Sequence, residues 1–175
     1  MKTYAGIGSR RLSQEEKGTC YDIGNWLARR GWALQTGAAD GADSSFAEGA
    51  VWGGGKVTLM LPWPTYRAPW VQEMTSQCPH LLSIRILNYL DKEAYNSVDM
   101  FHPRPEKLSF AARGLHARNW LIVEGTKFVI AWPKRDQFNN YGGTGQGMRL
   151  TREKGIDLIN LDYPDDYVRV IRKIR

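Results

Sequence analysis

The sequence lacks the features that mark membrane, secreted and metal-binding proteins. No apolar run approaches the roughly 20 residues of a membrane-spanning helix, and the opening stretch MKTYAGIGSR contains no apolar signal-peptide core. The two cysteines, Cys20 and Cys78, have no metal-ligand spacing around them. They could form a disulfide, although two thiols in a reducing cytoplasm are the simpler interpretation. We therefore expect a cytoplasmic protein that has no membrane segment and binds no metal.

The third glycine of a dinucleotide-binding fingerprint is also missing. Gly6 and Gly8 follow the first apolar run, but the position that requires the next glycine is Arg11. Ordinary NAD binding is therefore disfavoured, and we expect no cofactor. Two interpretations of the segment stay open. It is a tight turn, or Gly8, Ser9 and Arg10 hold a phosphate or a ribose, with Arg10 presenting a fork of donors.

The balance of charge favours an anionic ligand or a polyanionic partner. Lysine and arginine outnumber aspartate and glutamate by 24 to 18, which gives a net charge of +6. Part of the excess lies in the C-terminal run Arg169, Arg172, Lys173 and Arg175, which is more typical of a solvated face. Seven tryptophans suggest that some line the core, an oligomer interface or a base-stacking surface.

Short apolar runs alternate with helical patterns along the chain. The runs, which we expect to be strands, cover residues 2–7, 32–36, 57–61, 128–132 and 158–161. Helices are expected after Ser13, in the Ala-rich stretch before residue 50, over 107–123 and 144–154, and from Pro164. Unbroken apolar runs indicate a parallel sheet covered by helices on both faces. The chain, residues 1–175, is therefore expected to be one three-layer α/β domain with a mainly parallel sheet.

The segment 63–105 interrupts this alternation after the third expected strand. It is rich in proline and aromatic residues, and only its middle, Asp91 to Met100, has a helical pattern. We expect an irregular insertion over the mouth of the binding site.

Ligands of parallel α/β sheets bind beyond the carboxyl ends of the strands. Four loops should meet at that edge: residues 8–10, residues 37–43, the loop after Leu61, and residues 133–145.

The second of these loops contains two acids among small residues, from Gly37 to Asp43. We expect Asp43 mainly to cap the following helix. Asp40 is the candidate for a functional role, accepting hydrogen bonds from a ribose or a base edge. No third hard ligand lies nearby, so a metal site is disfavoured.

His116, Arg118 and Asn119 lie together on an expected helix, just before an apolar segment. An arginine that enters the core needs an anionic partner, which is either a protein carboxylate or a bound phosphate. We interpret His116 as a neutral polar contact rather than a catalytic base.

The glycine-rich stretch 142–147 is the strongest local motif. It lies between an expected strand and an expected helix, where glycine backbone and free helix N–H groups suit a phosphate. Gly142, Gly143, Thr144 and Gly145 form an expected turn, and Gln146 adds an amide to it.

Four motifs in order, GIGSR, TGAADGADSSFAEGA, ARNWLIV and GGTGQGMRL, resemble the SLOG superfamily of Rossmann-like proteins. This superfamily includes DprA-type DNA-processing proteins and LOG-type phosphoribohydrolases, and the chain is most similar to small DprA-like proteins often found in phages. The resemblance implies a ligand site and, by analogy with DprA proteins, a homodimer. Its ligand-binding residues would be Gly8, Ser9, Arg10, Gly37, Asp40, Asp43, Arg118, Asn119, Gly142, Gly143, Thr144, Gly145 and Gln146.

Three functions follow from this resemblance. The first is recognition of a phosphorylated nucleoside or a nucleotide-derived signal. The second is DprA-like binding of single-stranded DNA, with Trp63, Tyr66 and Trp70 as candidate stacking residues. The third is LOG-like hydrolysis of nucleoside monophosphates, for which Arg118 and Asp40 would be the catalytic residues. Against it, Gly147 and Met148 stand near the position of the glutamate that LOG-type enzymes use.

Overall fold

The computed structural model describes residues 2–137 and 140–173. Arg175 of the basic C-terminal run lies outside the described residues. Six strands form one sheet: β1 (Lys2–Gly8), β2 (Trp32–Thr36), β3 (Val57–Leu61), β4 (Leu82–Ile86), β5 (Phe128–Trp132) and β6 (Asp157–Asn160). All neighbouring strands are parallel, in the order β4-β3-β2-β1-β5-β6. The expected Rossmann-like α/β class is therefore confirmed, with one strand more than the sequence patterns indicate.

Seven helices and one 3₁₀ turn are described along the chain. They are α1 (Gln14–Ala28), α2 (Ala42–Trp52), α3 (Ala68–Gln77), α4 (Lys92–Phe101), η1 (Pro105–Lys107), α5 (Phe110–Val123), α6 (Gly142–Glu153) and α7 (Pro164–Lys173). Ser13 and Glu16 form the expected capping box at the start of α1. None of these helices combines the length and apolar character that crossing a membrane requires.

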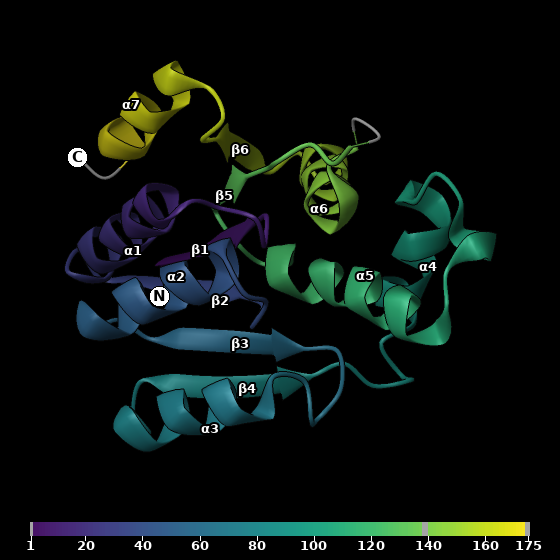
Figure 1. The fold of residues 1–175 in the computed structure, drawn as a ribbon, viewed down its shortest axis with the longest axis horizontal. Coiled ribbons are helices and arrows are strands. Elements are labelled where there is room, and N and C mark those ends of the chain that lie inside the picture. Colours follow the sequence, from purple (N-terminus) through teal and green to yellow (C-terminus); the bar gives the residue numbers. More distant parts are fainter. Residues whose placement is uncertain (1, 138–139, 174–175) are drawn as a thin grey trace.

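The helices cover the two faces of the sheet as separate layers. One core packs α1, α2, α3 and α7 against one face, and the other packs α4, α5 and α6 against the opposite face. Side chains alternate between the faces along β5, where Phe128 and Ile130 enter the first core while Val129 and Ala131 enter the second. Figure 1 shows α4, α5 and α6 grouped together, α3 beside β4 and α7 near β6. Cys20 and Cys78 are both free thiols.

The expectation of an irregular segment over 63–105 is wrong for most of its length. The segment contains α3, β4 and α4, and β4 extends the sheet beside β3. The helix expected near Asp91 to Met100 is confirmed as α4. The sequence pattern missed α3 because Pro69 lies in its first turn, where a missing N–H costs nothing. It missed β4 because this edge strand is mostly exposed and carries polar Ser83 and Arg85.

The strand order reverses between β1 and β5, and this reversal positions the candidate site. After β1 the chain continues into α1 on one face, and after β5 it continues into α6 on the other. The Ser9 N–H donates to the Trp132 carbonyl at 2.9 Å, which joins the carboxyl ends of the two strands. Because the chain diverges to opposite faces here, a crevice opens at this edge of the sheet.

Glycines allow α1 and α2 to pack closely, and this contact gives a first prediction. A Cβ on Gly49 of α2 would lie 2.0 Å from the Tyr21 carbonyl oxygen of α1, so the helices would have to separate. We expect Gly49→Ala to lower the stability by about 3 kcal/mol, roughly 6–12 °C in Tm. The matched control is Gly18→Ala in α1, where a Cβ meets no atom within 4 Å. It should raise Tm slightly, since alanine favours helix over glycine by about 0.5–1 kcal/mol. Equal shifts measured by thermal unfolding would contradict this account.

Candidate functional site

A pocket of about 370 Å³ lies at the carboxyl ends of β1 and β5. Its walls come from the end of β1 and the loop that follows it, from the loop after β5, from the loop before α2 and the start of that helix, and from α5 and the start of α6. The lining residues are Ile7, Gly8, Ser9, Arg10, Arg11, Ala39, Asp43, Ala112, Leu115, His116, Arg118, Asn119, Lys134, Asp136, Asn140, Tyr141, Gly142, Gly143 and Thr144. The pocket therefore occupies the position at which parallel α/β sheets bind ligands.

Positive charge predominates in this lining, with four cationic side chains against two carboxylates. The Arg11 guanidinium donates to the Arg135 carbonyl at 3.3 Å, and Lys134 pairs with Glu16. Arg10 is exposed and forms no ion pair or side-chain hydrogen bond with the part of the chain that the structure describes. Arg10 is therefore free to contact an anionic ligand.

Arg118 is the most unusual side chain of the pocket. It is a charged residue on α5 with only 6% of its surface exposed. Its Nη2 atom lies 3.8 Å from Asp43 Oδ2, while Nε and Nη1 have no hydrogen-bond partner among the described residues. Buried donors of this kind are nearly always paired in folded proteins. An acceptor from a ligand would satisfy them.

Gly37 makes the burial of this pair sterically feasible. A Cβ at Gly37 would lie 2.3 Å from both Arg118 Nη1 and Asp43 Oδ2. Gly37 itself does not line the pocket, so its role is to leave room for the two charged side chains rather than to contact a ligand. The Arg118 guanidinium also makes a cation–π contact with Tyr66, with Cζ over the ring at 5.7 Å from its centroid.

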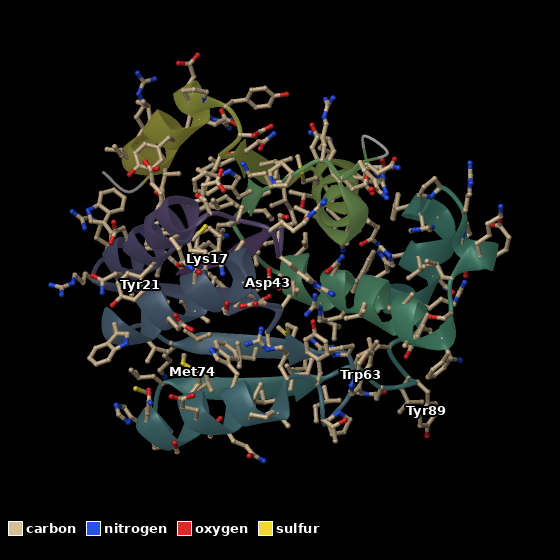
Figure 2. The ribbon with its side chains drawn as sticks, in the orientation of Figure 1. Lys17, Tyr21, Asp43, Trp63, Met74 and Tyr89 are labelled. Atoms are coloured by element: carbon tan, nitrogen blue, oxygen red, sulfur yellow. The ribbon has the colours of Figure 1, made fainter. Side chains whose placement is uncertain are left out.

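Asp40, in the loop between β2 and α2, and Asp43, in the first turn of α2, lie in environments that differ from the expected ones. α2 begins after Gly41, whose φ of +89° suits glycine, and no side chain caps it, so the capping role of Asp43 is wrong. Asp43 is instead buried in the pocket wall; Figure 2 shows it near the centre of the molecule. Burial raises the pKa of Asp43, while the Arg118 charge and the backbone of Ala39 and Gly8 oppose that shift.

Asp40, the aspartate expected to contact a ligand, does not line the pocket. Its side chain is 65% exposed and lies 3.4 Å from Arg67 Nη1. Partial desolvation raises the pKa of Asp40, but the hydrogen bond from the Gly41 backbone and the hydrogen bond and charge of Arg67 together lower it below its ordinary value. Asp40 is thus a charged surface residue beside the site.

The glycine-rich motif is the first turn of α6, not a turn before it. α6 begins at Gly142, and Tyr141, which precedes it, provides no side-chain cap. The N–H groups of a helix's first turn have no acceptor within the helix and carry partial positive charge. Gly142, Gly143 and Thr144 line the pocket, so these groups are near any anion bound there.

Asn119 fixes α5 against the start of α6. Its Nδ2 atom donates to the Gly143 carbonyl at 3.1 Å and to Gln146 Oε1 at 2.7 Å. Gln146 is fully buried and does not reach the pocket. Burial lowers the pKa of His116 to about 4, with a smaller effect from His102. His116 is therefore neutral near pH 7, which agrees with its interpretation as a neutral polar contact.

The structure brings together nine of the thirteen residues that the resemblance assigns to the ligand site. They are Gly8, Ser9, Arg10, Asp43, Arg118, Asn119, Gly142, Gly143 and Thr144, while Gly37, Asp40, Gly145 and Gln146 do not line the pocket. The loop after β3 contributes no lining residue among those described. The sequence interpretation overlooked Arg11, Lys134, Asp136 and Tyr141. Three of these four lie in the loop 133–145, which the carboxyl-edge rule placed at the site without naming these side chains, so that placement was the available signal.

No group of His, Cys, Asp and Glu side chains within residues 2–137 and 140–173 is arranged to hold a metal ion.

Solved structures of similar fold include two DNA processing proteins A. The chain matches the Helicobacter pylori protein, described for its unique single-stranded DNA binding mode, with a TM-score of 0.62 at 19% identity, covering 98% of this chain and 72% of that one. It matches the Streptococcus pneumoniae protein with a TM-score of 0.61 at 17% identity, covering 98% of this chain and 56% of that one.

A third similar structure is that of the structural-genomics protein TM1055, with a TM-score of 0.55 at 16% identity, covering 90% of this chain and 72% of that one. No protein-family model and no curated protein sequence matches the chain. At these identities the likeness concerns the fold.

The buried pair of Arg118 and Asp43 gives a second prediction. Arg118→Met removes the charge that opposes the burial of Asp43, so we expect a loss of about 3 kcal/mol near pH 7. Adding Asp43→Asn should restore most of the stability. The control is the pair of Arg113 and Asp99, 2.9 Å apart with the Asp99 side chain 55% exposed, and Arg113→Met should cost less than about 1 kcal/mol.

The same variant should respond to pH. Without Arg118 the pKa of Asp43 rises further, so the folded state takes up a proton at a higher pH than the unfolded state does. Stability is then gained as pH falls through that raised pKa, so the deficit of Arg118→Met should shrink as the pH is lowered from neutral. Urea unfolding at several pH values measures this, and a deficit that is independent of pH would contradict the assignment.

Proposed function

We propose that the chain binds a phosphorylated nucleoside in the pocket between the carboxyl ends of β1 and β5. The observation that supports this most directly is the Arg118 guanidinium, which is buried in the pocket wall with two donors unpartnered among the described residues. A guanidinium fork matches the oxygens of a phosphate, and charge-assisted hydrogen bonds of this kind are strong.

The remaining lining suits the other parts of a nucleotide. The first turn of α6 and the exposed Arg10 add donors for phosphate oxygens. Ile7, Ala112 and Leu115 provide apolar surface for a base. The Asp43 carboxylate provides acceptors for sugar hydroxyls. A nucleotide carries these three kinds of group together, whereas an inorganic anion would use only the first.

The arrangement favours binding over hydrolysis. Of the two residues expected to be catalytic, Arg118 lines the pocket and Asp40 does not. Asp43 is a carboxylate in the pocket, but it faces Arg118, which favours its ionised form. An assay for release of free base, run beside the binding measurements, separates a binding protein from an N-glycosidase.

A second candidate, binding of single-stranded DNA, is favoured by the likeness to the Helicobacter pylori protein. The aromatic residues expected to stack on bases are already engaged within the fold. Trp63, labelled in Figure 2, packs edge-on against Tyr66 with ring centroids 5.3 Å apart, and Trp70 Nε1 donates to Glu48 at 3.0 Å. A DNA strand would therefore depend on the basic pocket rather than on these rings.

The proposed function is tested by calorimetric titration with a panel of nucleoside 5′-monophosphates. Arg10→Ala should weaken binding of the best ligand by about tenfold or more, because it removes a charged hydrogen-bond donor. The control, Arg172→Ala on α7, makes the same change of charge at an exposed position that lines no pocket described here. Mass spectrometry of the denatured protein should also detect a co-purified nucleotide.

The result that would overturn the proposal is an absence of binding by every nucleotide of the panel, together with an absence of co-purified nucleotide. Equal weakening by Arg10→Ala and Arg172→Ala would place the ligand elsewhere.

Salt dependence separates the two candidate functions. Binding of a single strand that contacts several phosphates should weaken steeply as salt rises, with a slope in log–log form of about −0.7 per phosphate contact. A mononucleotide in the pocket should show a shallow dependence. Fluorescence polarisation with a labelled oligonucleotide measures the first slope; no binding even at low salt would exclude the DNA function.

A further inference from the structure

A second pocket, of about 580 Å³, adjoins the first one at the start of α6. Its walls combine the residues that follow α4, among them His102 and Arg104, with Tyr141, Gly142 and Arg149. Tyr141 and Gly142 line both pockets. The two spaces therefore meet at the N-terminus of one helix.

The lining of this second pocket is positively charged without internal compensation. Arg104 and Arg149 line it, and no carboxylate of the described residues does. The Arg149 Nε atom donates to the Phe101 carbonyl at 3.0 Å, which holds the guanidinium against the end of α4. No described carboxylate forms an ion pair with Arg149, and its partial burial and the neighbouring Arg152 lower its pKa. An anion bound at this position would stabilise the charged guanidinium and so counteract both the desolvation and the repulsion from Arg152.

Two contacts made by aromatic side chains mark the boundary between the pockets. His116 lines the first pocket and His102 the second, and their rings pack edge-on with centroids 4.7 Å apart. The Tyr141 hydroxyl accepts a hydrogen bond from Arg135 Nε at 2.8 Å, which fixes the tyrosine where the pockets meet. A ligand that passes from one pocket to the other must run alongside Tyr141.

The volumes of the two pockets indicate how many nucleotide units the ligand has. The first pocket, at about 370 Å³, is near the lower end of the ~300–1,000 Å³ range of small-ligand sites. It suits one nucleotide unit. The second pocket is larger and would stay unused by a mononucleotide, although its charge is as suited to phosphate as that of the first.

We infer that the ligand is a dinucleotide unit, with one phosphate at Arg118 and the start of α6 and a second phosphate at Arg104 and Arg149. This inference rests on the proposed function and specifies its ligand class. The shared chemistry is that of two phosphates separated by one nucleoside. Two kinds of molecule carry this pair of phosphates, a free dinucleotide and the end of a longer single strand.

The test compares 5′-phosphorylated homodinucleotides of A, C, G and T with the corresponding 5′-mononucleotides, by calorimetry. The dinucleotide should bind at least about tenfold more tightly, since the second phosphate adds charge-assisted hydrogen bonds. Arg104→Ala and Arg149→Gln should each reduce the ratio of dinucleotide to mononucleotide affinity toward one. Arg152→Ala, on the same helix but outside the pocket lining, should leave the ratio as it is in the parent protein.

Each outcome has a distinct meaning. Mononucleotide binding that depends on Arg10, with an equal affinity for dinucleotides, would overturn the inference and leave the proposed function intact. If no nucleotide binds, both are overturned. Arg104 is exposed, so its variant tests the inference even if Arg149→Gln fails to fold. A strand of about 12 nucleotides that binds much more tightly than the dinucleotide identifies the strand as the source, and equal affinity identifies the free dinucleotide.

Discussion

The burial of one positive charge constrains the whole carboxyl edge of the sheet. Arg118 enters the interior from α5, where an unpaired charge would cost several kcal/mol. Its countercharge, Asp43, comes from the start of α2 on the opposite side of the sheet, and the pair fits only because Gly37 has no Cβ. Two segments that are distant in sequence, the one from Gly37 to Asp43 and α5, therefore have to keep their relative positions for this charge to be accommodated.

That arrangement satisfies the arginine only in part. At 3.8 Å the contact with Asp43 is electrostatic rather than a close hydrogen bond, and two guanidinium donors stay without partners among the described residues. A protein under selection for stability alone would gain by replacing such a pair with apolar residues. The retained charge, the N-terminus of α6 and the exposed Arg10 all favour the same kind of occupant, an oxyanion with several acceptor oxygens.

The chain topology explains why these groups meet in a crevice rather than on a flat surface. β1 and β5 are neighbours, yet the chain leaves them towards α1 on one face and α6 on the other. The Ser9–Trp132 hydrogen bond holds the strand ends together, so the opening between the diverging segments is formed by backbone geometry. Side chains from the loops, from α2 and from α5 then determine its charge.

Local patterns in the sequence determined much of the framework. Unbroken apolar runs identified five of the six strands, because strands buried on both faces need apolar side chains at every position. The capping box at Ser13 and the glycine-rich stretch that begins α6 marked helix starts through local hydrogen bonding and backbone freedom. The carboxyl-edge rule then gathered Gly8, Arg10 and Gly143 around one site before any distance was known, while Arg118 was assigned to that site by the family resemblance.

Only the tertiary structure decided which charged residue has which environment. Asp40 and Asp43 look alike in sequence, but one lies on the surface beside Arg67 and the other is buried against Arg118. The edge strand β4 was missed because its exposure removes the apolar pattern, and pairing with β3 is a non-local contact. Burial and ion pairing depend on residues far apart in the chain, so periodicity and spacing carry no information about them.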